Sequence, residues 1–254
     1  AFDANEEKLT GAIDLTGGGT HTWAVAYDDL VSIHYFGEFR KGCWASRWAT
    51  ILDAIAAAFE DHDALLTECA ALDADLYKAA YAAGGEDYAF LCIMSYRHTI
   101  AAHKLIYDEK GELILLSKEN DSNGCIGTVD VTYPSAPLFA LAGSEYVKAL
   151  LRPVFRFARC DVWEFDFAPH DVGRYPYADG QIYGVGAAST EFDYSQGSVI
   201  PPFWMYPAGS GVYGLRNQMP VEECGNMLVM IAAAAWADGN QDFAAPWMDT
   251  LEKW

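Results

Sequence analysis

The feature that most constrains this chain is an alanine-rich segment, residues 43–83, whose apolar side chains recur at helical spacing. Two such patterns follow one another, over residues 48–59 and 65–76. Gly84-Gly85 ends the run, and acidic residues open a further helix over residues 86–105. The pattern therefore predicts long antiparallel helices with short connections.

The residues before Cys43 differ in character. In residues 11–40, a glycine-rich stretch is followed by β-branched and aromatic residues in rough alternation. This pattern predicts strands and loops. After the alanine-rich run, residues 106–116 predict a short hairpin that turns at residues 108–111. Residues 117–139 predict a long polar loop. Further helices are expected at residues 144–159 and 220–238, the latter with Pro220 at its first position. The fold class is thus mainly α, with a short β-containing N-terminal segment.

Composition excludes several classes of partner. The formal net charge of the 254 residues is −20, so nucleic acid and anionic membranes carry the same sign as the protein. No uninterrupted apolar stretch is long enough to cross a bilayer. The six cysteines show no metal-binding spacing, and we expect mostly free thiols. We therefore expect a small-molecule partner and no metal or other cofactor, while the oligomeric state stays open.

Three separate segments, residues 117–130, 170–175 and 222–226, hold polar residues that the expected helices do not need for packing. They lie in loops or at helix starts, where side chains from distant segments can converge at one end of a helical domain. The candidate catalytic residues are Asp130, Glu222 and Glu223, and the candidate substrate contacts are Lys118, Glu119, Asn123, His170, Asp171, Arg174, Tyr175 and Asn226.

Each candidate also has a plain structural interpretation. Asp130 is flanked by β-branched residues, so it is either a general acid with a raised pKa or a helix-cap aspartate. Glu222 and Glu223 point about 100° apart on a helix, so one can face a site while the other interacts with the helix dipole. His170 is either an acid–base group or metal ligand, or a structural histidine.

Three long stretches of the chain together resemble one family. SKENDSNGCIGTVDVTYPSAPLF, FAPHDVGRYPYADGQIYG and MPVEECGNMLVM resemble, in order and spacing, the signatures of the glutaminase A family. AYDDLVSIHYFG and YRHTIAAHKL are also similar to it, so that the resemblance covers residues 26–237. Cys224 stands where family members have serine.

The resemblance implies a β-rich region followed by an α/α six-hairpin barrel, with residues 1–42 as the tail of the first and residues 43–254 as the front part of the second. It also implies further residues on both sides, so we expect an incomplete barrel in a fragment or short member of the family. Members are described as secreted or envelope-associated enzymes that hydrolyse L-glutamine to L-glutamate and ammonia.

Three functions stay open on the sequence. The first is an amidohydrolase acting on glutamine or a related small amide, in which one carboxylate activates water and Asn123, Asn226 or backbone N–H groups bind the oxyanion. The second is a glycoside hydrolase that pairs Asp130 with Glu222 or Glu223. The third is a non-catalytic module that holds a carbohydrate or other small ligand on aromatic side chains.

Overall fold

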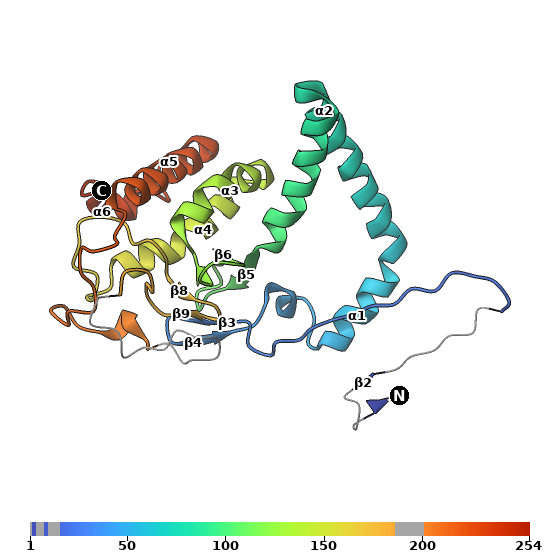
Figure 1. Cartoon of the computed structure of the whole chain (residues 1–254), viewed down its shortest axis with the longest axis horizontal. Helices are drawn as coiled ribbons and strands as arrows, with labels where there is room; N and C mark the ends of the chain where they lie inside the picture. The colour runs from blue at the N-terminus through green and yellow to red at the C-terminus, as the bar shows by residue number, and fades with distance from the viewer. Residues whose placement is uncertain (1, 4–7, 10–15, 186–200) are drawn as a thin grey trace.

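The computed structural model describes residues 2–3, 8–9, 16–185 and 201–254 (Figure 1). Strands β1 (Phe2–Asp3) and β2 (Lys8–Leu9) pair with each other. Residues 16–30 form no regular element and are exposed, so the strands expected over residues 11–40 reduce to β3 (Ile33–Tyr35) and β4 (Glu38–Arg40) in the described part of that range.

The alanine-rich run forms a 3₁₀ turn, η1 (Cys43–Ser46), and two helices, α1 (Ile51–Glu60) and α2 (His62–Ala101). Thr50 begins α1 with a capping box, in which its hydroxyl accepts from the Asp53 amide and the Asp53 carboxylate accepts from the Thr50 amide. Gly85, with φ +82°, breaks α2 into two arms that meet at an apex (Figure 1), which confirms the expected break.

The apolar face of these first helices is largely exposed. In the described structure, α1 has no buried residue, and α2 buries only Ala80 and Ala89. Cys69, whose place in the helical repeat is typical of a core residue, lies exposed on the first arm of α2. The described helices do not close into a barrel, which agrees with a mainly α, incomplete six-hairpin domain.

The core lies instead between a hairpin and three later helices. β5 (His103–Tyr107) and β6 (Leu113–Ser117) form the expected hairpin, and α4 (Ser144–Ala158) packs on β6. The buried face of α4 also packs against α3 (Val129–Ala142) and α5 (Pro220–Asp238), and the three helices lie side by side in Figure 1. Pro220 begins α5 as predicted.

Helix α3 corrects the prediction of one long polar loop over residues 117–139. Pro134 and Pro137 lie inside α3, and prolines of this kind predict the end of a helix from sequence. Packing on α4 and α5 stabilises the helix despite the prolines. The polar loop is therefore limited to residues 118–128 and contains β7 (Cys125–Ile126).

A five-stranded sheet connects the loops to the helical core. Its strand order is β4-β3-β9-β8-β7, where β8 is Gly173–Arg174 and β9 is Tyr177–Ala178. β9 runs parallel to β3, and the other neighbours are antiparallel. η3 (Phe203–Met205) precedes α5, and η4 (Ala245–Trp247) and α6 (Met248–Leu251) follow it. Trp247 of η4 and Trp254, just after α6, stack on Phe155 of α4. No described helix has the length and apolar character needed to span a membrane.

Candidate functional site

The sheet joins two of the three candidate segments. β7 pairs with β8, so that Cys125 lies opposite Arg174. At the start of α3, the Val129 amide donates to the carbonyl of His170 at 2.8 Å. This backbone hydrogen bond fixes the first turn of α3, and with it Asp130, beside His170.

His170 is held in one orientation by its neighbours. Its Nδ1 lies 3.0 Å from Oδ2 of Asp171, and its ring stacks on Tyr183 with centroids 4.1 Å apart. The backbone amide of His170 donates to the side-chain oxygen of Gln181 at 2.7 Å. Only 4% of the His170 side chain is exposed, so this histidine belongs to the interior wall of the site.

Asp171 is fully buried and accepts from the backbone. The amides of Gly173 and Ile182 donate to its Oδ1 at 2.9 Å, and the amide of Tyr183 donates to its Oδ2 at 3.0 Å. Since both oxygens are occupied by amides and by His170, Asp171 is a positioning residue that orients the imidazole.

The other face of His170 meets two acidic side chains. Its Nε2 lies 3.8 Å from Oδ2 of Asp130. Glu119, Asp130 and His170 each offer one possible ligand atom, and these three atoms lie within 4.8 Å of one another. Asp130 is partly exposed, and its Oδ1 has no hydrogen-bond partner among the described residues. The interpretation of Asp130 as a helix cap therefore has no support in its contacts.

Charges in the cluster act on each other. Burial raises the pKa of Glu119, and the nearby charge of Asp130 adds to the rise. Burial by itself lowers the pKa of His170, but the hydrogen bond and charge of Asp171 raise it above its ordinary value. The charges of Glu223 and Asp130 act in the same direction on His170.

Glu223 brings the third candidate segment to the same place. It lies in the first turn of α5, is completely buried, and neither carboxylate oxygen has a partner in the described part of the chain. Burial raises the pKa of Glu223 to about 8; the charge of His170 opposes the rise and that of Asp130 adds to it. A carboxyl group of this kind keeps its proton at neutral pH and can serve as a general acid.

The remaining candidates from the first two segments make contacts of their own. The Lys118 ammonium lies 4.5 Å from the ring centroid of Tyr175, a cation–π contact. Asn123 is exposed, and its Oδ1 accepts from the amide of Cys125 at 2.8 Å in an Asx turn. Arg174 lies on β8 and is partly buried. Substrate binding by these residues stays a prediction.

The two glutamates at the start of α5 differ as their spacing on a helix requires. Glu223 is buried beside His170, whereas Glu222 is exposed. Asn226, one turn after Glu222, is half-buried. The roles assigned to Glu222 and Asn226 stay predictions.

Sequence reasoning missed two buried polar groups, of which Gln181 contacts the candidate site and Asp179 fixes the sheet beside it. Gln181 accepts from His170 and donates to the Tyr183 carbonyl and to Gln218. Asp179 is also buried and pairs with His34 of β3, which ties β9 to the N-terminal strands. Both lie in the second polar segment, around residues 165–184, but their partners are distant in sequence and could not be read from it.

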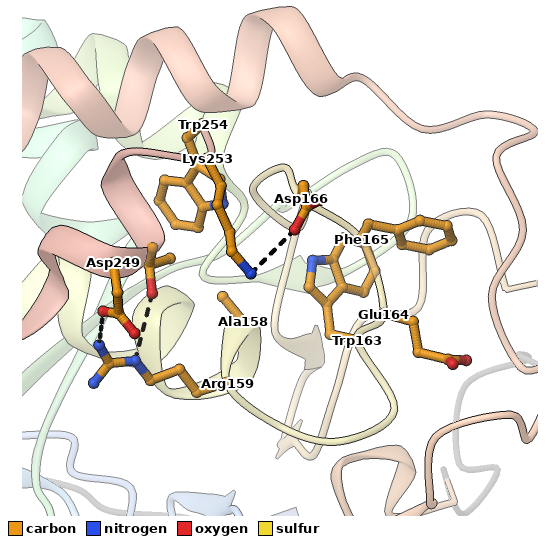
Figure 2. Close-up of a pocket in the computed structure, with 10 residues that line it drawn as sticks. Ala158, Arg159, Trp163, Glu164, Phe165, Asp166, Asp249, Lys253 and Trp254 are labelled. Carbon is orange, nitrogen blue, oxygen red and sulfur yellow. Dashed lines mark hydrogen bonds and ion pairs between the residues drawn. The ribbon is translucent and has the colours of Figure 1, made fainter.

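A pocket elsewhere is lined by paired charges. It has a volume of about 280 Å³ and lies between the end of α4 and the C-terminus (Figure 2). Lys253 pairs with Asp166 at 3.2 Å, and Arg159 pairs with Asp249. Because these charges already neutralise each other, and no candidate residue lines the pocket, the cluster around His170 is the better candidate site.

Two models of known protein families match parts of the chain. A model of the glutaminase A six helical-hairpin domain matches residues 85–254, and a domain of unknown function, DUF5127, matches residues 6–79. The proposed boundary between residues 42 and 43 stays a prediction.

Two curated fungal proteins are similar to the chain. The "Glutaminase A" of Aspergillus oryzae is 26% identical over 250 residues, which are 96% of this chain and 31% of that protein. A "Probable glutaminase" of Arthroderma benhamiae is 28% identical over 155 residues, 61% of this chain and 14% of that protein. The chain thus spans about a third of the first relative and less of the second. No solved structure matches it significantly.

Proposed function

The chain belongs to the glutaminase A six helical-hairpin family, and we propose that it hydrolyses L-glutamine, or a related small amide, to the acid and ammonia. Carboxyl groups of the chain serve as the general acid and base. The convergence of Asp130, His170 and Glu223 from three distant segments supports the proposal. The names of the two fungal relatives supply the substrate class. A secreted or envelope location, implied by the resemblance, is proposed with it.

The two carboxyl groups have different environments and therefore different roles. Asp130 is partly exposed and can contact a water molecule, so we assign it as the general base. Glu223 is buried and protonated near neutral pH, so we assign it as the general acid. Asp171 holds His170, which in turn faces Asp130.

The reaction balances with these two groups. Asp130 accepts a proton from water as the water oxygen bonds to the amide carbonyl carbon. The carbon–nitrogen bond then breaks, and the nitrogen leaves as ammonia with a proton from Glu223. Transfer of the proton from Asp130 to Glu223, directly or through solvent, restores the starting state.

Ammonia release from L-glutamine by the purified chain tests the proposal. Asp130→Asn and Glu223→Gln should each lower the rate by roughly 10²- to 10⁴-fold, the usual contribution of a general acid or base. Glu68→Gln, at an exposed position on α2, is the matched control and should leave the rate unchanged. A chain that releases ammonia equally well without Asp130 and Glu223 would contradict the assignment.

A glycoside hydrolase is the second candidate, because one buried protonated carboxyl beside a second carboxylate is also the apparatus of sugar hydrolysis. Parallel assays with aryl glycosides and with glutamine distinguish the glycosidase from the amidase. Release of the aryl group, without release of ammonia, would replace the amidase by the glycosidase.

A further inference from the structure

We infer that Glu119, Asp130 and His170 form a binding site for one divalent transition-metal ion, with Zn²⁺ as the ion of choice. Their three ligand atoms lie within 4.8 Å of one another, and Asp130 Oδ2 lies 3.8 Å from His170 Nε2. Ligands about 2.1 Å from a tetrahedral Zn²⁺ lie roughly 3.4 Å apart, so small side-chain movements suffice to reach that geometry. The sequence expectation of no metal relied on local spacing, and these ligands come from separate segments.

The surroundings of His170 are those of a metal ligand. A ligating histidine commonly donates its second N–H to a carboxylate, which fixes the tautomer and the ring orientation. Here Nδ1 is 3.0 Å from Asp171, so the unprotonated nitrogen can be Nε2, which faces Asp130 and Glu119. Three backbone amides hold Asp171 in turn.

Glu223 supplies an independent reason to expect a cation. It is completely buried, and neither of its oxygens has a hydrogen-bond partner among the residues that the structure describes. It interacts electrostatically with both His170 and Asp130. Buried polar atoms without hydrogen-bond partners are costly, and ionised acidic groups gathered around one imidazole repel one another. A divalent cation among them would compensate both.

The ligand types select the ion. One imidazole nitrogen with two carboxylates suits Zn²⁺ or Mn²⁺, whereas Ca²⁺ and Mg²⁺ prefer oxygen ligands only. Three protein ligands leave a coordination position for water, as in catalytic rather than structural zinc sites.

The inference goes beyond the proposed function, since cation binding needs no substrate. If both hold, Asp130 contributes to cation binding in place of accepting the proton from water. A cation of this kind lowers the pKa of a bound water molecule.

Titration of the chelator-treated full chain with Zn²⁺, followed by calorimetry, tests the inference. We expect one ion per chain, and we expect His170→Ala and Glu119→Gln each to weaken binding by at least about 10-fold. Glu119 is only half-buried, so its substitution should leave the fold intact, which circular dichroism verifies. His62→Ala is the matched control, because His62 also lies beside an aspartate, Asp63, but on the surface, and its loss should leave the affinity unchanged.

Two results would overturn the inference. One is the absence of Zn²⁺ binding, and the other is binding that both His170→Ala and Glu119→Gln leave unchanged, since the ion then sits elsewhere, for example on a free thiol. Ammonia release measured in parallel keeps the proposals apart. Full ammonia release after metal removal would support the hydrolase proposal and show that the reaction needs no metal. Zn²⁺ binding without ammonia release would support the metal site and contradict the hydrolase proposal.

Discussion

His170 and Asp171 are neighbours in the chain, and their side chains also meet, with Nδ1 of the imidazole 3.0 Å from Oδ2 of the carboxylate. Adjacent side chains seldom interact in regular structure, because they point in different directions. Here the backbone around Asp171 turns so that three later amides donate to its carboxylate. The aspartate therefore links the backbone of residues 173–183 to the histidine of the candidate site.

The first prediction concerns this link. Asp171→Asn retains the shape but replaces one acceptor oxygen with an NH₂ group, which faces either the Tyr183 amide and His170 or the amides of Gly173 and Ile182. Buried donors without acceptors cost about 1–3 kcal/mol each, so we expect a loss of roughly 2–4 kcal/mol in the free energy of unfolding, measured by urea denaturation.

Asp63→Asn is the matched control for that substitution. Asp63 also lies beside a histidine, His62, at 2.9 Å, but it is fully exposed. Its loss should leave the free energy of unfolding unchanged within the error of the measurement. If Asp171→Asn and Asp63→Asn change the free energy of unfolding equally, the buried hydrogen bonds of Asp171 contribute no more to stability than a surface contact.

The second prediction concerns pH and Glu223. The pKa of this carboxyl is raised to about 8 in the folded protein, so the folded state keeps a proton that the unfolded chain releases near pH 4.5. The stabilising contribution is fully present below about pH 4.5 and is lost as the pH rises to about 8. Glu223→Gln stays neutral, so its stability relative to the parent chain should increase by a few kcal/mol, at about 1.4 kcal/mol per pKa unit, between pH 5 and pH 9.

Denaturant melts of the two proteins across that pH range, with chelator present, measure the effect. A stability difference that stays constant from pH 5 to pH 9 would show that Glu223 ionises normally.

The third prediction concerns Gly173 in β8. Its φ is +147°, and a Cβ placed there would lie 2.0 Å from the carbonyl oxygen of Tyr177. Gly173→Ala must therefore distort the β8–β9 turn next to Asp171, and we expect a loss of stability greater than about 3 kcal/mol.

Gly225→Ala is the counterpart, at an exposed position in α5 with open space around the added methyl group. The higher helix propensity of alanine should raise stability by about 0.5–1 kcal/mol. Thermal melts of both variants check the pair, and a tolerated alanine at position 173 would refute the packing described for this turn.

The fourth prediction concerns the attachment of the C-terminal turns. Phe155 of α4 is completely buried and stacks on Trp247 and Trp254, with ring centroids 4.7 and 5.4 Å away. Phe155→Ala should cost about 3–5 kcal/mol. Phe90→Ala, at a residue 64% exposed on α2, should change stability by less than about 0.5 kcal/mol. If the two variants melt alike, the aromatic stack contributes little.

The sequence by itself determined where most helices lie. The break at Gly85, the hairpin turn near Asp108 and the start of α5 at Pro220 each depend on a local property of one or two residues. Helix α3 was missed because its local sequence signals oppose a helix. Pro134 and Pro137 argue locally against a helix, and only packing on α4 and α5 outweighs them.

Only the tertiary structure decided which polar residues meet. Sequence patterns grouped Glu119, Asp130, His170 and Glu223 as candidates, but they gave no means to separate them from Glu222 or Asn123. The pairing of β7 with β8, and the hydrogen bond from Val129 to His170, bring the first two segments together. The packing of α5 on α3 and α4 then buries Glu223 and leaves Glu222 in solvent. Helix signals act over a few residues and can be read locally, whereas burial and charge proximity depend on contacts between residues far apart in the chain.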